Sequence, residues 1–175
     1  MANTACGSRV VIVMGVSASG KSTVGAQIAQ RLGVPFLEGD RLHPASNRAK
    51  MASGHPLDDV DRRPWLAALT EWIRSTAAGG HGGVATCSTL KRAYRDQFRR
   101  TGADVWFIYL ALDREIAAER IAHRHGHFMP PKLLGSQYDI LDPLQADEPG
   151  VTIDASGSTA QVVAAALRAA CEPDR

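Results

Sequence analysis

Residues 15–22 carry glycines, hydroxyl side chains and a lysine at the spacing G-x-x-x-x-G-K-S. A loop of this kind turns its backbone N–H groups toward phosphate oxygens, and the positive end of the following helix adds to the attraction. The lysine of such a loop reaches the β- and γ-phosphates of a nucleotide, and the next hydroxyl ligates Mg²⁺. We therefore predict that Lys21 is catalytic and that Ser22 is a metal ligand. The residues predicted to hold the nucleotide phosphates are Gly15, Val16, Ser17, Ala18, Ser19, Gly20, Lys21, Ser22 and Thr23.

Asp40 is the candidate group for handling an acceptor hydroxyl. It follows a short predicted strand at residues 36–37, and ligands of open α/β sheets bind beyond the carboxyl ends of the strands. A carboxylate there can take the hydroxyl proton and orient the oxygen toward the γ-phosphate. A turn-capping role after Gly39 is an equally open interpretation. No acidic residue ends the predicted strand at 84–87, which favours Glu38 and Asp40 as helpers of the metal.

Two arginines four residues apart form a second candidate group. Arg120 and Arg124 share one face of a predicted helix, just before a Gly/Pro-containing break that includes His127. Mobile loops that close over phosphates present arginines in this way and add positive charge where negative charge develops. A solvated helix face paired with acidic neighbours such as Glu119 is the alternative.

A third basic group follows the predicted strand at 84–87. Lys91 and Arg95 lie four residues apart and nearest the strand end, so a small anionic acceptor such as a carboxylate would explain them. Nucleic acid is the competing partner, but it calls for interleaved aromatic side chains and a larger surplus of positive charge. The formal net charge is only +2, and Tyr94 and Phe98 have the spacing of side chains that pack on a sheet. We therefore expect no nucleic-acid partner.

Strands and helices alternate along the chain, and this order predicts an α/β fold with a parallel sheet covered on both faces. The strands are expected at residues 10–14, 36–37, 84–87, 105–110 and 151–154. The helices are expected at residues 23–32, about 47–52, 61–78, 91–100, 113–124, 132–141 and 158–170, with Asp61 as the N-cap of the third.

Length and composition set the remaining limits. The 175 residues, 45% of them hydrophobic and 22% charged, predict one globular domain over residues 1–175. The three cysteines are odd in number and lack metal-ligand or redox spacing, so we expect no disulfide scaffold and a reducing compartment. The apolar run at residues 10–14 is far too short to span a membrane. The expected location is the cytoplasm, with no membrane partner.

Residues 39–66, GDRLHPASNRAKMASGHPLDDVDRRPWL, together with MGVS at 14–17, resemble the small P-loop gluconate kinases. The resemblance covers residues 10–154, and the first stretch is far more specific than the phosphate loop. The other matching positions are 87–91, 94–96, 107–110, Arg120 with Arg124, 126–128, 133–134 and 136–137.

This resemblance implies an enzyme, a gluconokinase, that converts D-gluconate and ATP with Mg²⁺ into 6-phospho-D-gluconate and ADP. The product would feed gluconate into the pentose phosphate pathway. The implied fold is that of nucleoside monophosphate and shikimate kinases, a five-stranded parallel sheet with a substrate-binding region at about 40–64 and a small lid at about 120–135. The family resembled is commonly dimeric, so a homodimer is expected.

The resemblance also suggests residue roles. Asp40 would meet the acceptor hydroxyl, and Arg120 and Arg124 would be catalytic lid arginines, with His127 in the same closing segment. Arg62 stands where shikimate kinases hold a carboxylate. The other residues expected to bind the substrate are His43, Lys91 and Arg95.

Two other functions remain open from sequence. A kinase for shikimate or a nucleoside monophosphate is the rival enzyme, although residues 40–66 offer no aromatic pair for stacking a base. A nucleotide-dependent switch is the rival from another class. It would hydrolyse ATP slowly without any stimulation by gluconate.

Overall fold

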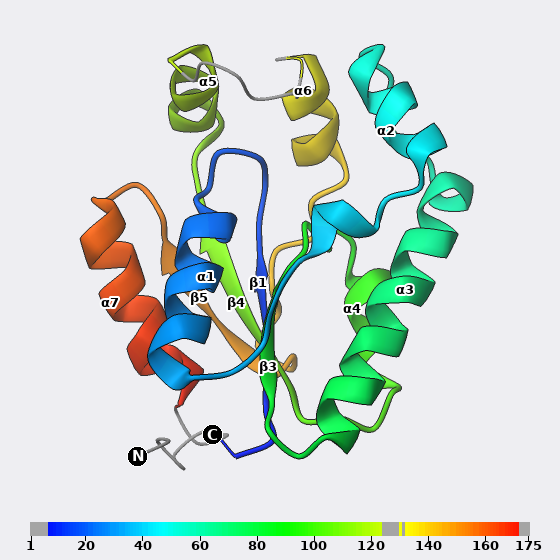
Figure 1. Cartoon of the computed structure of the whole chain (residues 1–175). Coiled ribbons are helices and arrows are strands. Elements are labelled where there is room, and N and C mark those ends of the chain that lie inside the picture. The colour runs from blue at the N-terminus through cyan, green and yellow to red at the C-terminus, as the bar shows by residue number, and fades with distance from the viewer. Residues whose placement is uncertain (1–6, 124–129, 131, 172–175) are drawn as a thin grey trace.

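A five-stranded parallel sheet in the order β2-β3-β1-β4-β5 forms the centre of the computed structural model of this protein. The structure describes residues 7–123, 130 and 132–171 (Figure 1). The expected α/β fold and its five parallel strands are confirmed. The strands are β1 (Val10–Met14), β2 (Phe36–Glu38), β3 (Gly83–Thr86), β4 (Val105–Ala111) and β5 (Gly150–Asp154).

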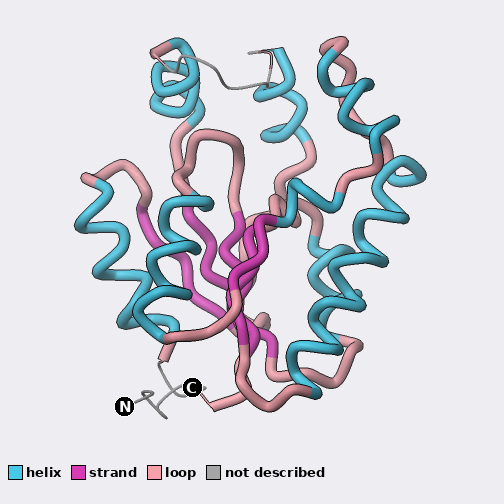
Figure 2. Tube along the Cα trace, viewed as in Figure 1, coloured by secondary structure: helices cyan, strands magenta, loops and turns pink. Residues whose placement is uncertain are grey.

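Helices cover both faces of this sheet, as Figure 2 shows. Alternate residues of β1 enter two different cores, because successive strand side chains point to opposite faces. Val11 and Val13 belong to the core with α1 and α7, whereas Ile12 and Met14 belong to the core with α3 and α4. The helices are α1 (Lys21–Leu32), α2 (Ala45–Ala52), α3 (Asp59–Ala78), α4 (Arg92–Arg99), α5 (Arg114–Ala122), α6 (Lys132–Asp139) and α7 (Thr159–Ala170).

The start of α3 differs from the prediction. Its N-cap is Asp58, whose carboxylate accepts the backbone N–H of Asp61 at 2.8 Å, and the Asp61 carboxylate accepts the N–H of Asp58 at 2.9 Å. Asp61 is therefore the third residue of a reciprocal capping box and not the cap itself. The acidic run offered two residues able to cap, and only the pair of bonds decides between them. The predicted capping box of α7, Ser158 with Gln161, is confirmed.

The segment after β2 is set by one close approach between strands. Glu38 of β2 pairs with Thr86 of β3, and Gly39 then begins a short 3₁₀ turn, η2 (Gly39–Leu42). A Cβ on Gly39 would lie 2.0 Å from the carbonyl oxygen of Thr86, so this position has no room for a side chain. The approach brings Asp40 to the carboxyl edge of the sheet, where the loop after β1 also lies.

Two further findings concern the cysteines and the membrane. Cys87 is free and buried, as expected of a small apolar residue, and burial raises the pKa of its thiol. Cys171 is disulfide-bonded, which the cysteine count did not predict. Among the described residues, none of the helices has the length and apolar character needed to cross a membrane.

Candidate active site

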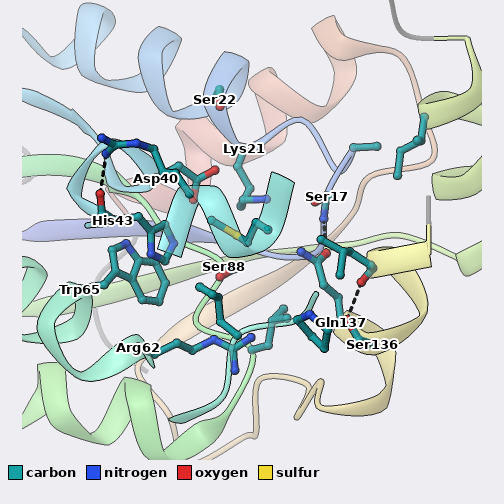
Figure 3. Close-up of a pocket in the computed structure, with 18 of the residues that line it drawn as sticks. Ser17, Lys21, Ser22, Asp40, His43, Arg62, Trp65, Ser88, Ser136 and Gln137 are labelled. Carbon is teal, nitrogen blue, oxygen red and sulfur yellow. Dashed lines mark hydrogen bonds between the residues drawn. The ribbon is translucent and has the colours of Figure 1, made fainter. Parts of the chain in front are cut away.

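A cavity of about 590 Å³ opens at the carboxyl ends of the strands. Its walls come from the loop after β1, from η2, from α2 and α3, from the segment after β3 and from α6. Lys21, Ser22, Asp40, His43 and Arg62, all singled out from the sequence, line it together (Figure 3). The topology therefore gathers most of the predicted phosphate, hydroxyl and carboxylate groups at one place.

The phosphate-binding loop has the backbone shape that its sequence predicts. Gly15 has φ 144°, and a Cβ there would lie 2.7 Å from the carbonyl oxygen of Leu110. Gly20 caps α1 with φ 91°, so α1 begins directly at Lys21. The Lys21 ammonium donates to the carbonyl oxygen of Val16 at 2.9 Å, which curls its side chain back over the loop. Ala18 has φ 66°, a left-handed conformation that costs a residue with a Cβ roughly 1–2 kcal/mol.

Trp65 holds in place both the turn that carries Asp40 and the side chain of His43. The indole N–H of Trp65 donates to the carbonyl oxygen of Gly39 at 2.9 Å and so fixes the turn that carries Asp40. The imidazole of His43 stacks on Trp65 with ring centroids 4.4 Å apart and an interplanar angle of 12°. Burial lowers the pKa of His43, although the charge of Asp40 opposes this shift. His43 is thus a neutral side chain at pH 7.

The tautomer of His43 follows from its neighbour Asn47. The Asn47 side-chain nitrogen donates to the carbonyl oxygen of Asp61 at 2.7 Å, which identifies it as the nitrogen end of the amide. The same nitrogen lies 3.4 Å from Nδ1 of His43, so Nδ1 accepts and the ring proton is on Nε2. His43 therefore offers an N–H donor on its other edge.

Arg62 lines the cavity, whereas Lys91 does not. The Lys91 ammonium pairs with the Asp59 carboxylate at 2.8 Å. Hydrogen bonds from Lys91 and Tyr94 lower the pKa of Asp59, and burial raises the pKa of Tyr94. The Tyr94 hydroxyl donates to Asp59 and accepts from Arg62 at 3.3 Å. This network pairs Lys91 with Asp59, whereas Arg62 lines the cavity together with Lys21 and Arg48.

Arg95 lies elsewhere. Its side chain is fully buried and donates to both carboxylate oxygens of Glu148, at 2.6 and 2.7 Å, and to the carbonyl oxygens of Thr89 and Asp142. Burial acts to raise the pKa of Glu148, but the bonds from Arg95 and from the backbone N–H of Gln145, together with the charges of Arg95 and Arg92, leave that pKa below its ordinary value. The structure does not bring Arg95 to the cavity that the spacing suggested, because its guanidinium is committed to this pair.

Arg120 lines a second cavity, of about 440 Å³, on the outer side of the phosphate loop. Its guanidinium donates to the carbonyl oxygens of Ala18 at 3.2 Å and of Ala155 at 2.8 Å, joining the loop to the segment after β5. Arg120 does not line the first cavity. Its expected partners at the lid, Arg124 and His127, lie outside the described residues.

Hard oxygen ligands suited to Mg²⁺ stand beside the loop. The Ser22 hydroxyl and the Asp40 carboxylate line the cavity. The Glu38 carboxylate, at the end of β2, instead accepts a hydrogen bond from the Thr86 hydroxyl. No cluster of three His, Cys, Asp or Glu that could hold a metal occurs within the part of the chain that is described. This donor set fits Mg²⁺, which keeps several waters and takes few protein ligands beside substrate phosphates.

Sequence reasoning gave no role to Gln137 or Ser88, which line the first cavity, or to the residues after β5 that line the second. The side-chain oxygen of Gln137 accepts the backbone N–H of Ser17 at 2.7 Å, across 120 positions of sequence. The resemblance to the family at 133–134 and 136–137 was the signal that pointed to this helix.

Comparisons with known proteins agree with this geometry. A family model described as AAA domain matches residues 10–135. "Gluconokinase" of Gluconobacter oxydans is 46% identical over 145 residues, which cover 83% of this chain and 82% of that protein. The crystal structure of a gluconokinase from Sinorhizobium meliloti has a TM-score of 0.82 at 43% identity and covers 92% of this chain and 90% of that one.

A second solved structure, of an unliganded sugar kinase from Janibacter, has a TM-score of 0.87 at 42% identity, covering 92% of this chain and 93% of that one. Identity at this level over most of both chains shows common ancestry. The chain therefore belongs to the AAA domain family and to the gluconokinase family.

Proposed function

We propose that this protein transfers the γ-phosphoryl group of ATP to D-gluconate and releases 6-phospho-D-gluconate and ADP. The observation that carries the proposal is the meeting of Lys21, Asp40 and Arg62 in one cavity. They provide a phosphate-binding cation, a carboxylate for a hydroxyl proton and a cation for an acid group. Gluconate has a hydroxyl at one end and a carboxylate at the other, which matches this set.

The two cavities divide the substrates between them. The phosphates of ATP bind at the backbone N–H groups of the loop and at the N-terminus of α1. The second cavity, with Arg120 and the segment after β5, takes the base and ribose, because it borders the loop through Ala18 and Gly20. Arg120 then supports the nucleotide from the base side, and the γ-phosphate points toward Asp40.

Gluconate occupies the first cavity. The Arg62 guanidinium binds its carboxylate, since a guanidinium pairs with two carboxylate oxygens at once. The Nε2–H of His43 donates to a hydroxyl of gluconate. Trp65, which stacks on His43, provides an apolar wall of the cavity. The cavity of about 590 Å³ is of the size that small-ligand sites have.

Transfer takes place between these two ligands. The terminal hydroxyl oxygen of gluconate forms a bond to the γ-phosphorus while the bond from that phosphorus to the β–γ bridging oxygen breaks. Asp40 accepts the hydroxyl proton, and Lys21 moves from the Val16 carbonyl to the phosphate oxygens and offsets their charge. Mg²⁺ held at Ser22 would neutralise charge on the β- and γ-phosphates.

A coupled assay of ADP release tests the proposal. The acceptor panel is D-gluconate, shikimate, glycerate, glucose and several nucleoside monophosphates, each with Mg·ATP. Strong stimulation by gluconate alone supports the proposal. Stimulation by another compound of the panel would identify that compound, and not gluconate, as the acceptor. Acceptor-independent turnover at the same rate with every compound would instead favour a nucleotide-dependent switch.

The proposal includes the cytoplasm as the place of action and a homodimer as the assembly. ATP is supplied in the cytoplasm, and the resemblance to the gluconate kinases implies the dimer. Light scattering on the purified protein measures the assembly, with a mass of twice 18.7 kDa expected. A mass of one chain at assay concentration would contradict it.

A further inference from the structure

Ser88 brings a hydroxyl group into the first cavity. It follows β3 at the carboxyl edge of the sheet and lines the cavity together with Lys21 and Arg62. In Figure 3 the Ser88 hydroxyl lies between these two cations. Within residues 7–123, 130 and 132–171, this hydroxyl has no hydrogen-bond partner. The hydroxyl of Ser136, in the same cavity, is by contrast committed to the carbonyl oxygen of Leu133 at 2.7 Å.

The backbone that carries Ser88 is held on both sides. The N–H of Cys87 donates to a carbonyl oxygen of β1 at 3.1 Å, and the carbonyl oxygen of Leu90 accepts the N–H of Asp142 at 2.7 Å. Between these bonds, Thr89 has φ 35°, which is a strained conformation for a β-branched residue. Such conformations persist only where the surrounding structure enforces them, and they gather at ligand sites. A backbone segment held in place therefore presents the Ser88 side chain to the cavity.

A hydroxyl between Lys21 and Arg62 faces the middle of a ligand that spans the cavity. In the proposed complex, the terminal hydroxyl of gluconate lies at Lys21 and Asp40, and the carboxylate lies at Arg62. The carbons between these two ends carry hydroxyl groups, each of which can donate and accept a hydrogen bond. The Ser88 hydroxyl has the same two capacities and carries no charge, so it matches such a group.

We propose that the Ser88 hydroxyl forms a hydrogen bond with the C3 or C4 hydroxyl of bound gluconate and so selects hydroxylated sugar acids over their deoxy analogues. The inference rests on the proposed function and adds to it a residue that determines specificity. Arg62 recognises the acid group and Asp40 the reacting hydroxyl. Neither contact distinguishes gluconate from an acid that lacks a hydroxyl in the middle of the chain, and Ser88 provides that distinction.

The variant Ser88→Ala, measured with gluconate, 3-deoxygluconate and 4-deoxygluconate, tests the inference. The affinity for each deoxy acid is taken as its Ki in competition with gluconate, which is defined whether or not the analogue is phosphorylated. The KM for gluconate should rise roughly 3- to 10-fold in the variant, as for a hydrogen bond removed from a bound ligand. The deoxy acid that lacks the partner hydroxyl should bind equally well to the variant and to the unmodified protein.

Two further measurements confine the effect to the acceptor. The Kd of ATP, measured by calorimetry, should be the same for Ser88→Ala and for the unmodified protein. Ser75→Ala is the control variant, because Ser75 is exposed on α3 and does not line the cavity. It should match the unmodified protein in every measurement.

Three outcomes would contradict the inference. An unchanged KM for gluconate in Ser88→Ala would show that the hydroxyl makes no bond to the acceptor. An equal loss of affinity for gluconate and for both deoxy acids would show that the substitution disturbs the cavity as a whole. Inactivity of the unmodified chain on gluconate would overturn the proposed function and the inference together, whereas the first two outcomes overturn the inference alone.

Discussion

The imidazole of His43 lies flat on the indole of Trp65, with ring centroids 4.4 Å apart, while the indole N–H holds the carbonyl oxygen of Gly39. Trp65 therefore supports two parts of the site. It supports His43, the proposed hydrogen-bond donor to the acceptor, and the turn that carries Asp40. Trp65 is 1% exposed and lines the cavity, so this support comes from a core side chain.

The buried position of His43 predicts a loss of stability in acid. Its pKa lies below the ordinary value of 6.5 because burial disfavours the charged ring, with Asp40 opposing and Arg62 and Arg48 reinforcing the shift. Between pH 6.5 and the folded-state pKa, the unfolded chain binds a proton that the folded chain does not, so stability falls as pH falls. His43→Gln should flatten this part of a plot of unfolding free energy against pH. His81→Gln, at an exposed position, should not. Parallel plots for all three proteins would contradict the prediction.

Lys21→Met should reduce kcat by roughly two to three orders of magnitude, as the loss of a group that stabilises transition-state charge does. The ammonium sits on the loop itself, where its bond to Val16 already holds it over the phosphate site. Arg31→Met, at the exposed far end of α1, is the matched control. A folded Lys21→Met protein with kcat near that of the control would disprove the assignment of the loop.

Asp40→Asn should lower kcat by about two to four orders of magnitude, the range for loss of a general base, while the Kd of ATP changes little. The amide keeps the shape of the side chain and cannot take the hydroxyl proton. Asp104→Asn serves as control, since Asp104 precedes β4 at the opposite edge of the sheet. If ATP affinity fell and kcat did not, Asp40 would be a metal-binding or structural residue.

The parts of the site that sequence predicts well are those fixed by local geometry. The phosphate loop is one continuous segment between an apolar strand and a helix, so its residue types determine its shape. Asp40 was found because the end of a parallel strand has a known place in the sheet. The capping box of α7 is equally local.

The parts that sequence could not predict depend on partners far along the chain. Arg95 looked like a carboxylate-binding residue, and its ion pair with Glu148, 53 positions later, cannot be read from spacing. The same holds for Gln137 and Ser17. Lys91 was placed at the site by its distance from the strand end, but Asp59 on α3 takes its charge.

Arg62→Met should raise the KM for gluconate by about 10- to 100-fold, since hydrogen bonds to charged groups contribute about 1.5–3 kcal/mol. The kcat should fall less, because the carboxylate is remote from the reacting hydroxyl. Arg63→Met is the control, since Arg63 is exposed and does not line the cavity. The Arg62 variant should also lose its preference for gluconate over glucose, which has no carboxylate. Unchanged KM in a folded Arg62→Met protein would refute this role.

Arg95→Met should destabilise the protein by about 3–5 kcal/mol, because it leaves the carboxylate of Glu148 buried without its partner. The double variant Arg95→Met/Glu148→Leu should recover much of this loss, since it removes both charges and fills the space with apolar atoms. Urea unfolding of the two variants and of Glu148→Gln measures the difference.

The same variants separate a structural role of Arg95 from the binding role that its spacing suggested. At a temperature where the double variant is folded, its KM for gluconate should be close to that of the unmodified protein, whereas the KM of Arg62→Met is raised. The bonds from Arg95 to the carbonyl oxygens of Thr89 and Asp142 tie the segment after β3 to the segment before β5, so their loss acts on the fold. A raised KM with unchanged stability would instead mean that Arg95 reaches the acceptor when gluconate binds.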